Sequence, residues 1–443
     1  MEIVEEAKKF AIMAHKGQVR KSEVDKPFII HPVGVAKILD EYGLDEHVIA
    51  AGYLHDVVED TKYTIQDIRT NFGDDIANLV YTATEPDKSL SWEERKQHTI
   101  NTTKGLNYRN KAVICADKIH NLESLMILFG KTGRMDFSKF KKGLEEQRWY
   151  YTEVYKSIVN GENPDLPMFK RLKNAIDVVF NGKEDTFLKD VVFEDNPKYY
   201  QKLKSLHASK LELEQLKTYS SLDRPFIIEF TGTPRTGKTS TISSLYDFFK
   251  KGGFNIKVIE EFTSSKYYKE EFRKKYQHLD TADFNLAIMD KVGEQLKSAS
   301  ASDNDIVIID RSISDRQIWN MIRLMKQEMS KWQYDKARTQ YIVDASNLID
   351  YLVILYADAI TALKRDYNAH LSLEQRSFLN EGNLKDFNDA LARSEELLFD
   401  TVQDVSFIDT AYSSIQDTSV MVASDVMPII RKRYLDSFKK KYK

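Results

Sequence analysis

Residues 226–250 read FIIEFTGTPRTGKTSTISSLYDFFK, and they indicate the class of fold in the C-terminal half of the chain. The apolar residues 226–230 are typical of a buried strand, and residues 240–250 have the pattern of a helix. Between them, residues 232–239 fit the pattern G-x-x-x-x-G-K-[ST]. Where this pattern joins a strand to a helix, its glycines let the backbone amides curl around phosphates at the helix N-terminus. The stretch therefore predicts a phosphate-binding loop.

The chemistry of this pattern predicts ATP and Mg²⁺ as ligands of the loop. The Lys238 ammonium group is expected to reach the β- and γ-phosphates, and the Thr239 hydroxyl is expected to hold Mg²⁺. The residues that we expect to line the nucleotide are Gly232, Thr233, Pro234, Arg235, Thr236, Gly237, Lys238, Thr239 and Ser240.

Four further apolar runs follow along the chain, at residues 256–259, 306–309, 351–355 and 405–408. They alternate with longer segments of helical period, and this alternation is typical of a parallel sheet with crossover helices. We therefore predict an α/β domain with a five-stranded parallel sheet over residues 223–443.

Charged residues follow the ends of the predicted strands, where parallel sheets bind their ligands. Glu260 or Glu261 after the second strand, and Asp310 and Arg311 after the third, are expected to converge on Lys238. A surface ion pair between Asp310 and Arg311 is the alternative.

A polar and charged segment, residues 370–393, lies beyond the fourth predicted strand. Arg365, Arg376 and Arg393 would be available in this region to clamp a phosphoryl group. A mobile lid and a solvated pair of helices both fit the segment.

The N-terminal half has a different pattern, because helical period dominates about the first 160 residues. We predict an all-α domain over residues 1–190, which makes the chain multidomain. Residues 191–222 are interpreted as a connecting helix in which Lys, Leu and Glu are frequent. That helix either contacts a second copy of the chain or packs on its own domain.

One segment of this half, residues 54–61, gathers imidazole and carboxylate groups at the end of an apolar helical pattern. On a continuous helix, His55 would share a face with Glu59, and Asp56 would share a face with Asp60. Such charges repel one another. A divalent cation relieves the repulsion and leaves carboxylates free to move protons.

Residues 14–22, 27–32, 54–61 and 116–121 resemble the HD hydrolase domain of RelA/SpoT enzymes, and most of all the small metazoan SpoT homologues. The resemblance implies a phosphohydrolase that removes the 3′-pyrophosphate of (p)ppGpp-like nucleotides. Imidazole and carboxylate ligands suit manganese, iron or zinc, and manganese is the ion that the resemblance implies. The implied ligands are His31, His55, Asp56 and Asp117.

The same resemblance implies roles for residues around the metal. Glu59 and Asp60 would position and deprotonate the attacking water. Arg20 and Lys21 would lie near the phosphates or the base of the substrate, and Asn121 near its sugar. A solvated loop is the alternative for Arg20 and Lys21.

Two departures from the family pattern leave the substrate open. The Gly-Glu-Pro that often precedes the first ligand histidine is replaced by the longer residues 22–27, and the family's Leu-Ala-Asp-Arg reads CADK at residues 115–118. The first departure could reshape the base pocket, so another nucleotide such as NADPH stays an alternative substrate. His15 and His120 either support the metal ligands or are packed structural histidines.

A second resemblance is carried by residues 232–239, Glu261, 310–312, 314–316 and Arg365. These residues resemble the thymidylate kinase and deoxynucleoside kinase group of P-loop kinases. The resemblance implies that Glu261 is the base on an acceptor hydroxyl and that Arg311 contacts the acceptor or the transferred phosphate. Thr239 and Asp310 would hold Mg²⁺. The acceptor, a nucleoside, a nucleotide or a related small molecule, is left open.

The composition limits the class of protein. The chain has 443 residues, a net charge of −3 and 42% hydrophobic residues, which suits two or three folded domains and disfavours nucleic acid as a partner. The single cysteine, Cys115, excludes an internal disulfide framework. The first ten residues lack the pattern of a secretory signal, and the longest apolar stretch, about residues 351–357, is too short to span a bilayer.

These patterns predict a cytoplasmic, bifunctional enzyme whose partners are small-molecule nucleotides, with no membrane partner and with homo-oligomers left open. A metal-dependent hydrolase would be fused to an ATP-dependent kinase. The alternative is a hydrolase that is regulated by a C-terminal domain for ATP sensing or subunit assembly.

Overall fold

The computed structural model describes residues 2–20, 23–85, 89–133, 137, 140–181, 192, 195–370 and 379–442. The chain forms two compact units. The first unit comprises Met1–Ser221 together with Tyr434–Lys443, and the second comprises Leu222–Arg433. Lys21 and Arg376, both predicted to bind substrate, lie outside the described residues. Among the helices that are described, none has both the length and the apolar character that crossing a membrane requires.

The first unit is mostly helical, as predicted, and it also contains a short antiparallel hairpin. Its elements are α1 (Glu2–Ala14), β1 (Val19–Arg20), β2 (Glu23–Pro27), α2 (Ile30–Glu41), α3 (Glu46–Leu54), α4 (Val57–Asp60), α5 (Ile65–Ala83), α6 (Trp92–Lys104), α7 (Tyr108–Thr132), α8 (Leu144–Val159), α9 (Pro167–Phe180) and α10 (Pro197–Tyr219).

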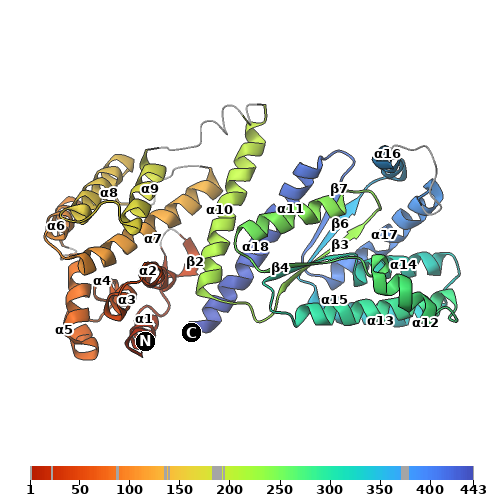
Figure 1. The fold of residues 1–443 in the computed structure, drawn as a ribbon, viewed down its shortest axis with the longest axis horizontal. Coiled ribbons are helices and arrows are strands. Elements are labelled where there is room, and N and C mark those ends of the chain that lie inside the picture. The colour runs from red at the N-terminus through yellow and green to blue at the C-terminus, as the bar shows by residue number, and fades with distance from the viewer. Residues whose placement is uncertain are drawn as a thin grey trace. The chain divides into compact units, whose positions relative to one another are not determined.

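Helix α7 is the centre of the first unit, because α2, α3, α5, α8, α9 and α10 all pack against it (Figure 1). Its buried face is made of small and branched apolar residues, among them Ala112, Val113 and Ile119. Helix α10, expected as a connecting helix, packs along α7 and buries Leu206 and Leu213 within this unit. The packing corresponds to the second of the two alternatives for that helix.

The second unit contains the predicted sheet. Its elements are β3 (Phe226–Gly232), α11 (Lys238–Lys251), β4 (Ile256–Ile259), the 3₁₀ turn η2 (Phe262–Ser264), the π-helical turn η3 (Tyr268–Phe272), α12 (Arg273–Lys275), α13 (Thr281–Ser300), β5 (Ile306–Asp310), α14 (Ile313–Met325), α15 (Lys331–Leu348), β6 (Tyr351–Tyr356), α16 (Ala359–His370), α17 (Glu381–Thr401), β7 (Val405–Asp409) and α18 (Ile415–Lys441), whose last residues group with the first unit.

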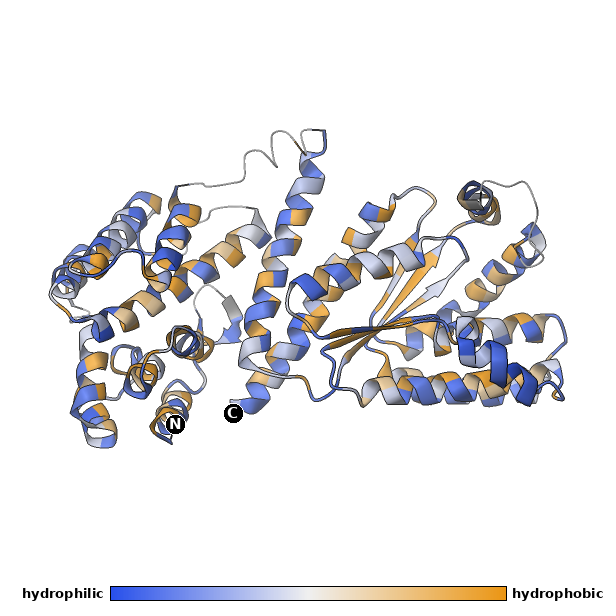
Figure 2. Cartoon of the chain, in the orientation of Figure 1, coloured by the Kyte–Doolittle hydropathy of each residue, from blue (hydrophilic) through white to orange (hydrophobic). Residues whose placement is uncertain are grey.

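The sheet has five parallel strands in the order β4-β5-β3-β6-β7, which confirms the predicted fold class. The strands are apolar along most of their length (Figure 2), as expected for a parallel sheet that is covered by helices on both faces. One face packs on α13, α14, α15 and α17 through a buried cluster that includes Ile227, Val307 and Ile354. The central strand β3 carries the phosphate-binding loop at its C-terminal end.

Candidate functional site

The four implied metal ligands come from three places in the first unit. His31 lies in the first turn of α2, where the following Pro32 is well tolerated. His55 and Asp56 form the turn between α3 and α4, and Asp117 lies on α7. The expectation of one continuous helix through His55 is wrong, because α3 ends at Leu54 and α4 begins at Val57. The interruption places both ligands in a turn between two helices.

The ligand atoms of these side chains converge. The Nε2 atom of His31 lies 3.2 Å from Nε2 of His55, 3.1 Å from Oδ1 of Asp117 and 3.4 Å from Oδ2 of Asp56. The Nε2 atom of His55 lies 3.3 Å from Oδ1 of Asp56. His31, His55 and Asp117 satisfy the geometry of a metal-binding group.

Hydrogen bonds outside this group orient the ligands. His55 Nδ1 lies 2.8 Å from the carbonyl oxygen of Gly52, so Nδ1 carries the proton and the Nε2 lone pair faces the other ligands. Asn121 Nδ2 donates to Asp117 Oδ1 at 2.6 Å, and Lys118 Nζ donates to Asp117 Oδ2 at 2.6 Å. Lys118 was not predicted as a functional residue, although its position next to Asp117 in the sequence was a signal.

The electrostatics favour a cation. Burial lowers the pKa of His31 to about 3, so its imidazole is neutral and offers a lone pair. Burial raises the pKa of Asp56 to about 7, and the nearby Asp117, Glu59 and Asp60 carboxylates add to this effect. Burial opposes ionisation of Asp117 as well, but the neighbouring Lys118 ammonium group holds the pKa of that carboxyl well below its usual range. These donors fit a divalent metal ion.

The other predicted residues of this unit lie around the four ligands. Glu59 and Asp60 are on α4, close enough to Asp56 to influence its pKa. Asp60 is exposed, and its carbonyl oxygen accepts a hydrogen bond from the Gln18 side chain. Arg20 Nη2 donates to Asn121 Oδ1 at 3.0 Å, so these two residues meet beside Asp117. Their roles toward water and substrate remain predictions.

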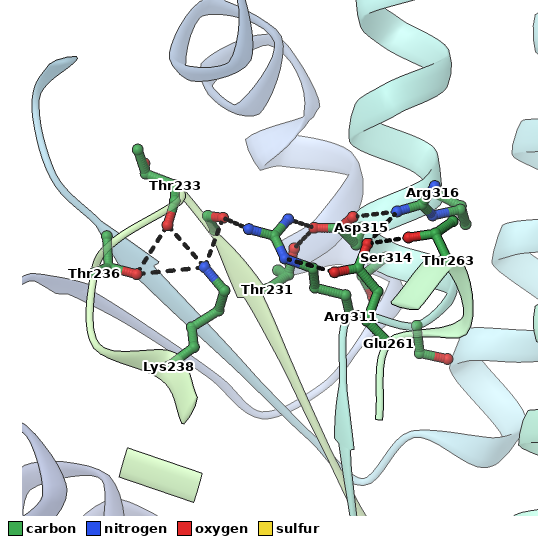
Figure 3. A network of polar contacts seen from close by, with 12 residues as sticks. Thr231, Thr233, Thr236, Lys238, Glu261, Thr263, Arg311, Ser314, Asp315 and Arg316 are labelled. Atoms are coloured by element: carbon green, nitrogen blue, oxygen red, sulfur yellow. Dashed lines mark hydrogen bonds and ion pairs between the residues drawn. The ribbon is translucent and has the colours of Figure 1, made fainter. Parts of the chain in front are cut away.

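The loop after β3 has the backbone of a phosphate cradle. Gly232 has a φ of 121° and Gly237 a φ of 88°, values that glycine adopts without strain. Lys238 Nζ donates to the carbonyl oxygens of Gly232 at 3.1 Å and Thr233 at 2.7 Å (Figure 3). Burial, together with the positive charge of Arg311, lowers the pKa of Lys238 to about 7.

Arg311 and Glu261 join a network beside this loop (Figure 3). Arg311 donates to Asp315 Oδ1 at 2.6 Å and to the Gly232 carbonyl oxygen at 3.2 Å. Glu261 lies 3.7 Å from Arg311 and 3.5 Å from Arg316. Arg311 thus lies between Lys238, with which it shares the Gly232 carbonyl oxygen, and Glu261.

One of the two predicted Mg²⁺ ligands, Asp310, has surroundings that suit a cation. The Oδ1 atom of Asp310 is buried and has no hydrogen-bond partner among the described residues, and burial raises the pKa of this carboxyl. Such an oxygen suits a hard cation. Thr239 and Ser240 are exposed in the first turn of α11.

Glu229 is a buried residue of this site that the sequence reasoning missed. It lies in the middle of β3, and its carboxylate accepts hydrogen bonds from the backbone amides of Ser312 and Ser314 and from the Ser314 hydroxyl, at 2.8 to 3.0 Å. It thus holds the turn that carries Arg311 into α14. A charged residue within an apolar strand was the available signal.

The arginines of the later helices have separate surroundings. Arg365 donates to Thr410 Oγ1 at 2.9 Å and to the Thr410 carbonyl oxygen, and it lies 3.5 Å from the Arg235 carbonyl oxygen. Arg393 is exposed and lines a cavity of about 540 Å³ between α14, α15 and α17. Arg365 therefore lies beside the loop, and its role toward a phosphoryl group remains a prediction.

Comparison with known protein families gives one match in each unit. The HD domain model matches residues 7–134, and an AAA domain model matches residues 227–378. A solved structure of thymidylate kinase from Candida albicans is 15% identical, covers 48% of this chain and 94% of that chain, and has a TM-score of 0.36.

Curated relatives match the first unit. The guanosine-3′,5′-bis(diphosphate) 3′-pyrophosphohydrolase MESH1 of Xenopus tropicalis is 41% identical over 125 residues, which are 28% of this chain and 69% of that protein. A GTP pyrophosphokinase of Streptomyces coelicolor is 37% identical over 128 residues, but the alignment spans only 15% of that protein. Through its first unit, the chain belongs to the HD-domain family that includes the MESH1 pyrophosphohydrolases.

Proposed function

We propose that the first unit is a manganese-dependent phosphohydrolase that removes the 3′-pyrophosphate from (p)ppGpp-like nucleotides. The observation that carries this proposal is the convergence of His31, His55, Asp56 and Asp117, with both Nε2 atoms facing the carboxylates. The relationship to the MESH1 enzymes supports the choice of substrate.

The roles of the residues follow from their chemistry. A divalent cation held by these ligands supplies Lewis-acid activation of water and of a phosphoryl oxygen. The water oxygen bonds to the phosphorus next to the 3′-oxygen, the bond from that phosphorus to the 3′-oxygen breaks, and a proton passes to the leaving oxygen. Glu59 and Asp60 accept the proton of the attacking water. Arg20 neutralises phosphate charge with its planar guanidinium group.

We further propose that the second unit is an ATP-dependent kinase for a nucleoside, a nucleotide or a similar small acceptor. Lys238 binds the β- and γ-phosphates, Thr239 and Asp310 hold Mg²⁺, and Glu261 accepts the proton of the acceptor hydroxyl. The oxygen of that hydroxyl bonds to the γ-phosphorus while the bond from the γ-phosphorus to the β,γ-bridging oxygen breaks, and Arg311 neutralises the transferred charge. We place both reactions in the cytoplasm, where these nucleotides occur.

A second candidate function is ATP sensing without turnover. It is favoured by the internal pairing of Lys238 with its own loop and of Arg311 with Asp315. In that case ATP would change the rate of the hydrolase, and no acceptor would be phosphorylated.

One assay series tests these proposals. For the hydrolase, the purified chain is incubated with Mn²⁺ and with ppGpp, pppGpp or NADPH. For the kinase, it is incubated with ATP, Mg²⁺ and a panel of nucleosides and nucleotides. Mass spectrometry identifies the products of both assays. We expect Mn²⁺-dependent loss of pyrophosphate from ppGpp, and acceptor-dependent formation of ADP that Glu261→Ala abolishes. Hydrolysis of ppGpp without any metal would contradict the first proposal. Hydrolysis of NADPH but of neither ppGpp nor pppGpp would contradict it as well. A change of hydrolysis rate with ATP and no phosphorylated acceptor would favour the sensor.

A further inference from the structure

The metal ligand His31 has a second contact on the side away from the other ligands. Its Nε2 atom faces Asp117 and Asp56, while its Nδ1 atom lies 2.9 Å from Nδ1 of His120. Both imidazoles are buried, with exposed fractions of 4% for His31 and 1% for His120. Since two ring nitrogens at this distance share one proton, one of them must donate and the other must accept.

Arg20 decides the direction of this hydrogen bond. Its Nη1 atom lies 3.4 Å from the same Nδ1 atom of His120, and a guanidinium group can only donate. His120 Nδ1 is therefore the acceptor for both Arg20 and His31, so the proton of the neutral His120 ring is on Nε2. That Nε2 atom lies 3.3 Å from the Tyr219 hydroxyl oxygen, which accepts a hydrogen bond from the Nε2 proton.

The contact between His120 and Tyr219 depends on a glycine in α2 and on the position of α10. A Cβ atom at Gly34 would lie 2.1 Å from the His120 ring and 2.9 Å from the Tyr219 hydroxyl, so α2 needs a glycine at this position. Tyr219 is only 5% exposed, at the C-terminal end of α10. The same helix is anchored by Glu212, which is 1% exposed and pairs with Lys26 at 2.7 Å and with Lys131.

We infer that Tyr219 and His120 are positioning residues that hold His31 in the tautomer with its proton on Nδ1 and its lone pair on Nε2. The order of donation is His31 to His120 to Tyr219, and it leaves Nε2 of His31 free to bind a metal ion. Tyr219 lies beyond residues 7–134, where the HD domain model matches. Helix α10 is therefore part of the metal site. The inference rests on the proposed function only in that His31 binds the metal.

The principal test is the affinity of Tyr219→Phe for Mn²⁺, measured by isothermal titration calorimetry on the full chain without nucleotide. Loss of a group that directly contacts a ligand histidine typically weakens metal binding about 10- to 100-fold, and because Tyr219 acts through His120 we expect a loss near the lower end of this range. The matched control is Tyr351→Phe, which removes a buried tyrosine hydroxyl that contacts Ser406 in the second unit. It should leave the Mn²⁺ affinity unchanged. An affinity of Tyr219→Phe equal to that of the control would overturn the inference.

A second measurement does not depend on the stability of any variant. Nitrogen-15 chemical shifts of the histidine rings in the wild-type chain bound to Zn²⁺, a diamagnetic cation, should show a protonated Nδ1 on His31 and a protonated Nε2 on His120. A protonated Nδ1 on a neutral His120 would overturn the inference. A chain that binds Mn²⁺ as expected but hydrolyses no nucleotide would refute the proposed function and leave the inference in place.

Discussion

The two candidate sites balance their charges in different ways. In the first unit, the Nε2 atoms of His31 and His55 lie 3.2 Å apart and face the carboxylates of Asp56 and Asp117. In the second unit, Lys238 donates to two carbonyl groups of its own loop. The polar groups of the first site share one point of convergence, whereas Lys238 and Arg311 of the second site already donate to groups of the protein.

The ligands of the two sites therefore change the charge balance in different ways. A cation in the first site neutralises carboxylates that otherwise repel one another, so we expect it to stabilise that unit strongly. A nucleotide in the second site must first draw Lys238 away from the carbonyl oxygens of Gly232 and Thr233, so part of its binding free energy is used to break existing hydrogen bonds. Metal should therefore raise the unfolding temperature of the first unit more than nucleotide raises that of the second.

The largest expected effect is that of Asp56→Ala. Removal of this ligand should lower the rate of Mn²⁺-dependent hydrolysis by at least about 100-fold. It should also remove the rise in unfolding temperature that Mn²⁺ causes. The metal-free variant should be at least as stable as the wild type, because it lacks a partly buried carboxylate that repels the carboxylates of Asp117 and Glu59. Calorimetric scans with and without Mn²⁺ measure this.

The control for this prediction is Asp75→Asn. It alters another His–Asp pair of the same unit, in which His47 Nδ1 lies 2.6 Å from Asp75, but at an exposed position. Its hydrolysis rate should match the wild type. Full activity of Asp56→Ala would show that the four ligands do not act as one site.

The next largest effect concerns Lys238→Ala. Loss of the ammonium group should lower ATP turnover about 100-fold or more, because one charge-stabilising donor is typically worth this much. The Mn²⁺ affinity of the first unit should stay unchanged. Steady-state kinetics and titration calorimetry check both parts, with Lys291→Ala, an exposed lysine that pairs with Glu294, as the control. If Lys238→Ala bound and turned over ATP as the wild type does, the loop would have no part in the mechanism.

A smaller effect is expected from the buried Glu229. Burial raises the pKa of its carboxyl to about 7 from the ordinary value of 4.5. The folded state therefore holds this proton more tightly than the unfolded chain does. The free energy of unfolding of the second unit should fall by up to about 3 kcal/mol as the pH rises from about 4.5 through about 7.

Glu229→Gln tests this pH dependence. The amide oxygen can still accept from the backbone amides of Ser312 and Ser314, and the amide nitrogen can donate to the Ser314 hydroxyl. Urea unfolding at about pH 5 and about pH 8 should show the loss in the wild type and a much weaker one in the variant. An unchanged loss in the variant would assign the pH dependence to other groups.

The smallest effect is expected for Arg365→Ala. Its guanidinium group bonds to Thr410 and lies near the Arg235 carbonyl oxygen, so its removal should destabilise the second unit by about 1–2 kcal/mol. Because Arg235 belongs to the loop, KM for ATP should rise while kcat changes little. The exposed Arg393→Ala is the control. A large fall in kcat with an unchanged KM would instead identify Arg365 as a phosphoryl clamp.

Much of the fold could be predicted from the sequence because the sheet is parallel and covered on both faces. Its strands are therefore apolar along most of their length, and β4 has the bounds that residues 256–259 predict. The hairpin of β1 and β2 was not predicted, since Glu23–Pro27 reads EVDKP and has no strand-like apolar run. Lys26 of β2 pairs with Glu212 of α10, and no local pattern of the sequence reports a contact between such distant segments.

The candidate sites were predictable to a different degree. The ligands His31, His55, Asp56 and Asp117 were found through a family resemblance, while the helical spacing of His55 and Glu59 led to a continuous helix that the structure interrupts. Tyr219 could not be found in this way, because it meets His120 across 99 positions of the chain and lies on a helix without a motif. Contacts of this range depend on packing alone.

Gly232 shows how a motif residue can serve two purposes at once. A Cβ atom there would lie 2.1 Å from the carbonyl oxygen of Leu355 on the neighbouring strand β6, whether or not a nucleotide is bound. In an alanine scan of the loop, the replacement of Gly232 would thus damage the sheet. The resulting loss of activity would be mistaken for the loss of a catalytic contact. A homologue that has lost every phosphate contact would still have to keep this glycine, so its persistence in a sequence is no evidence of an active kinase.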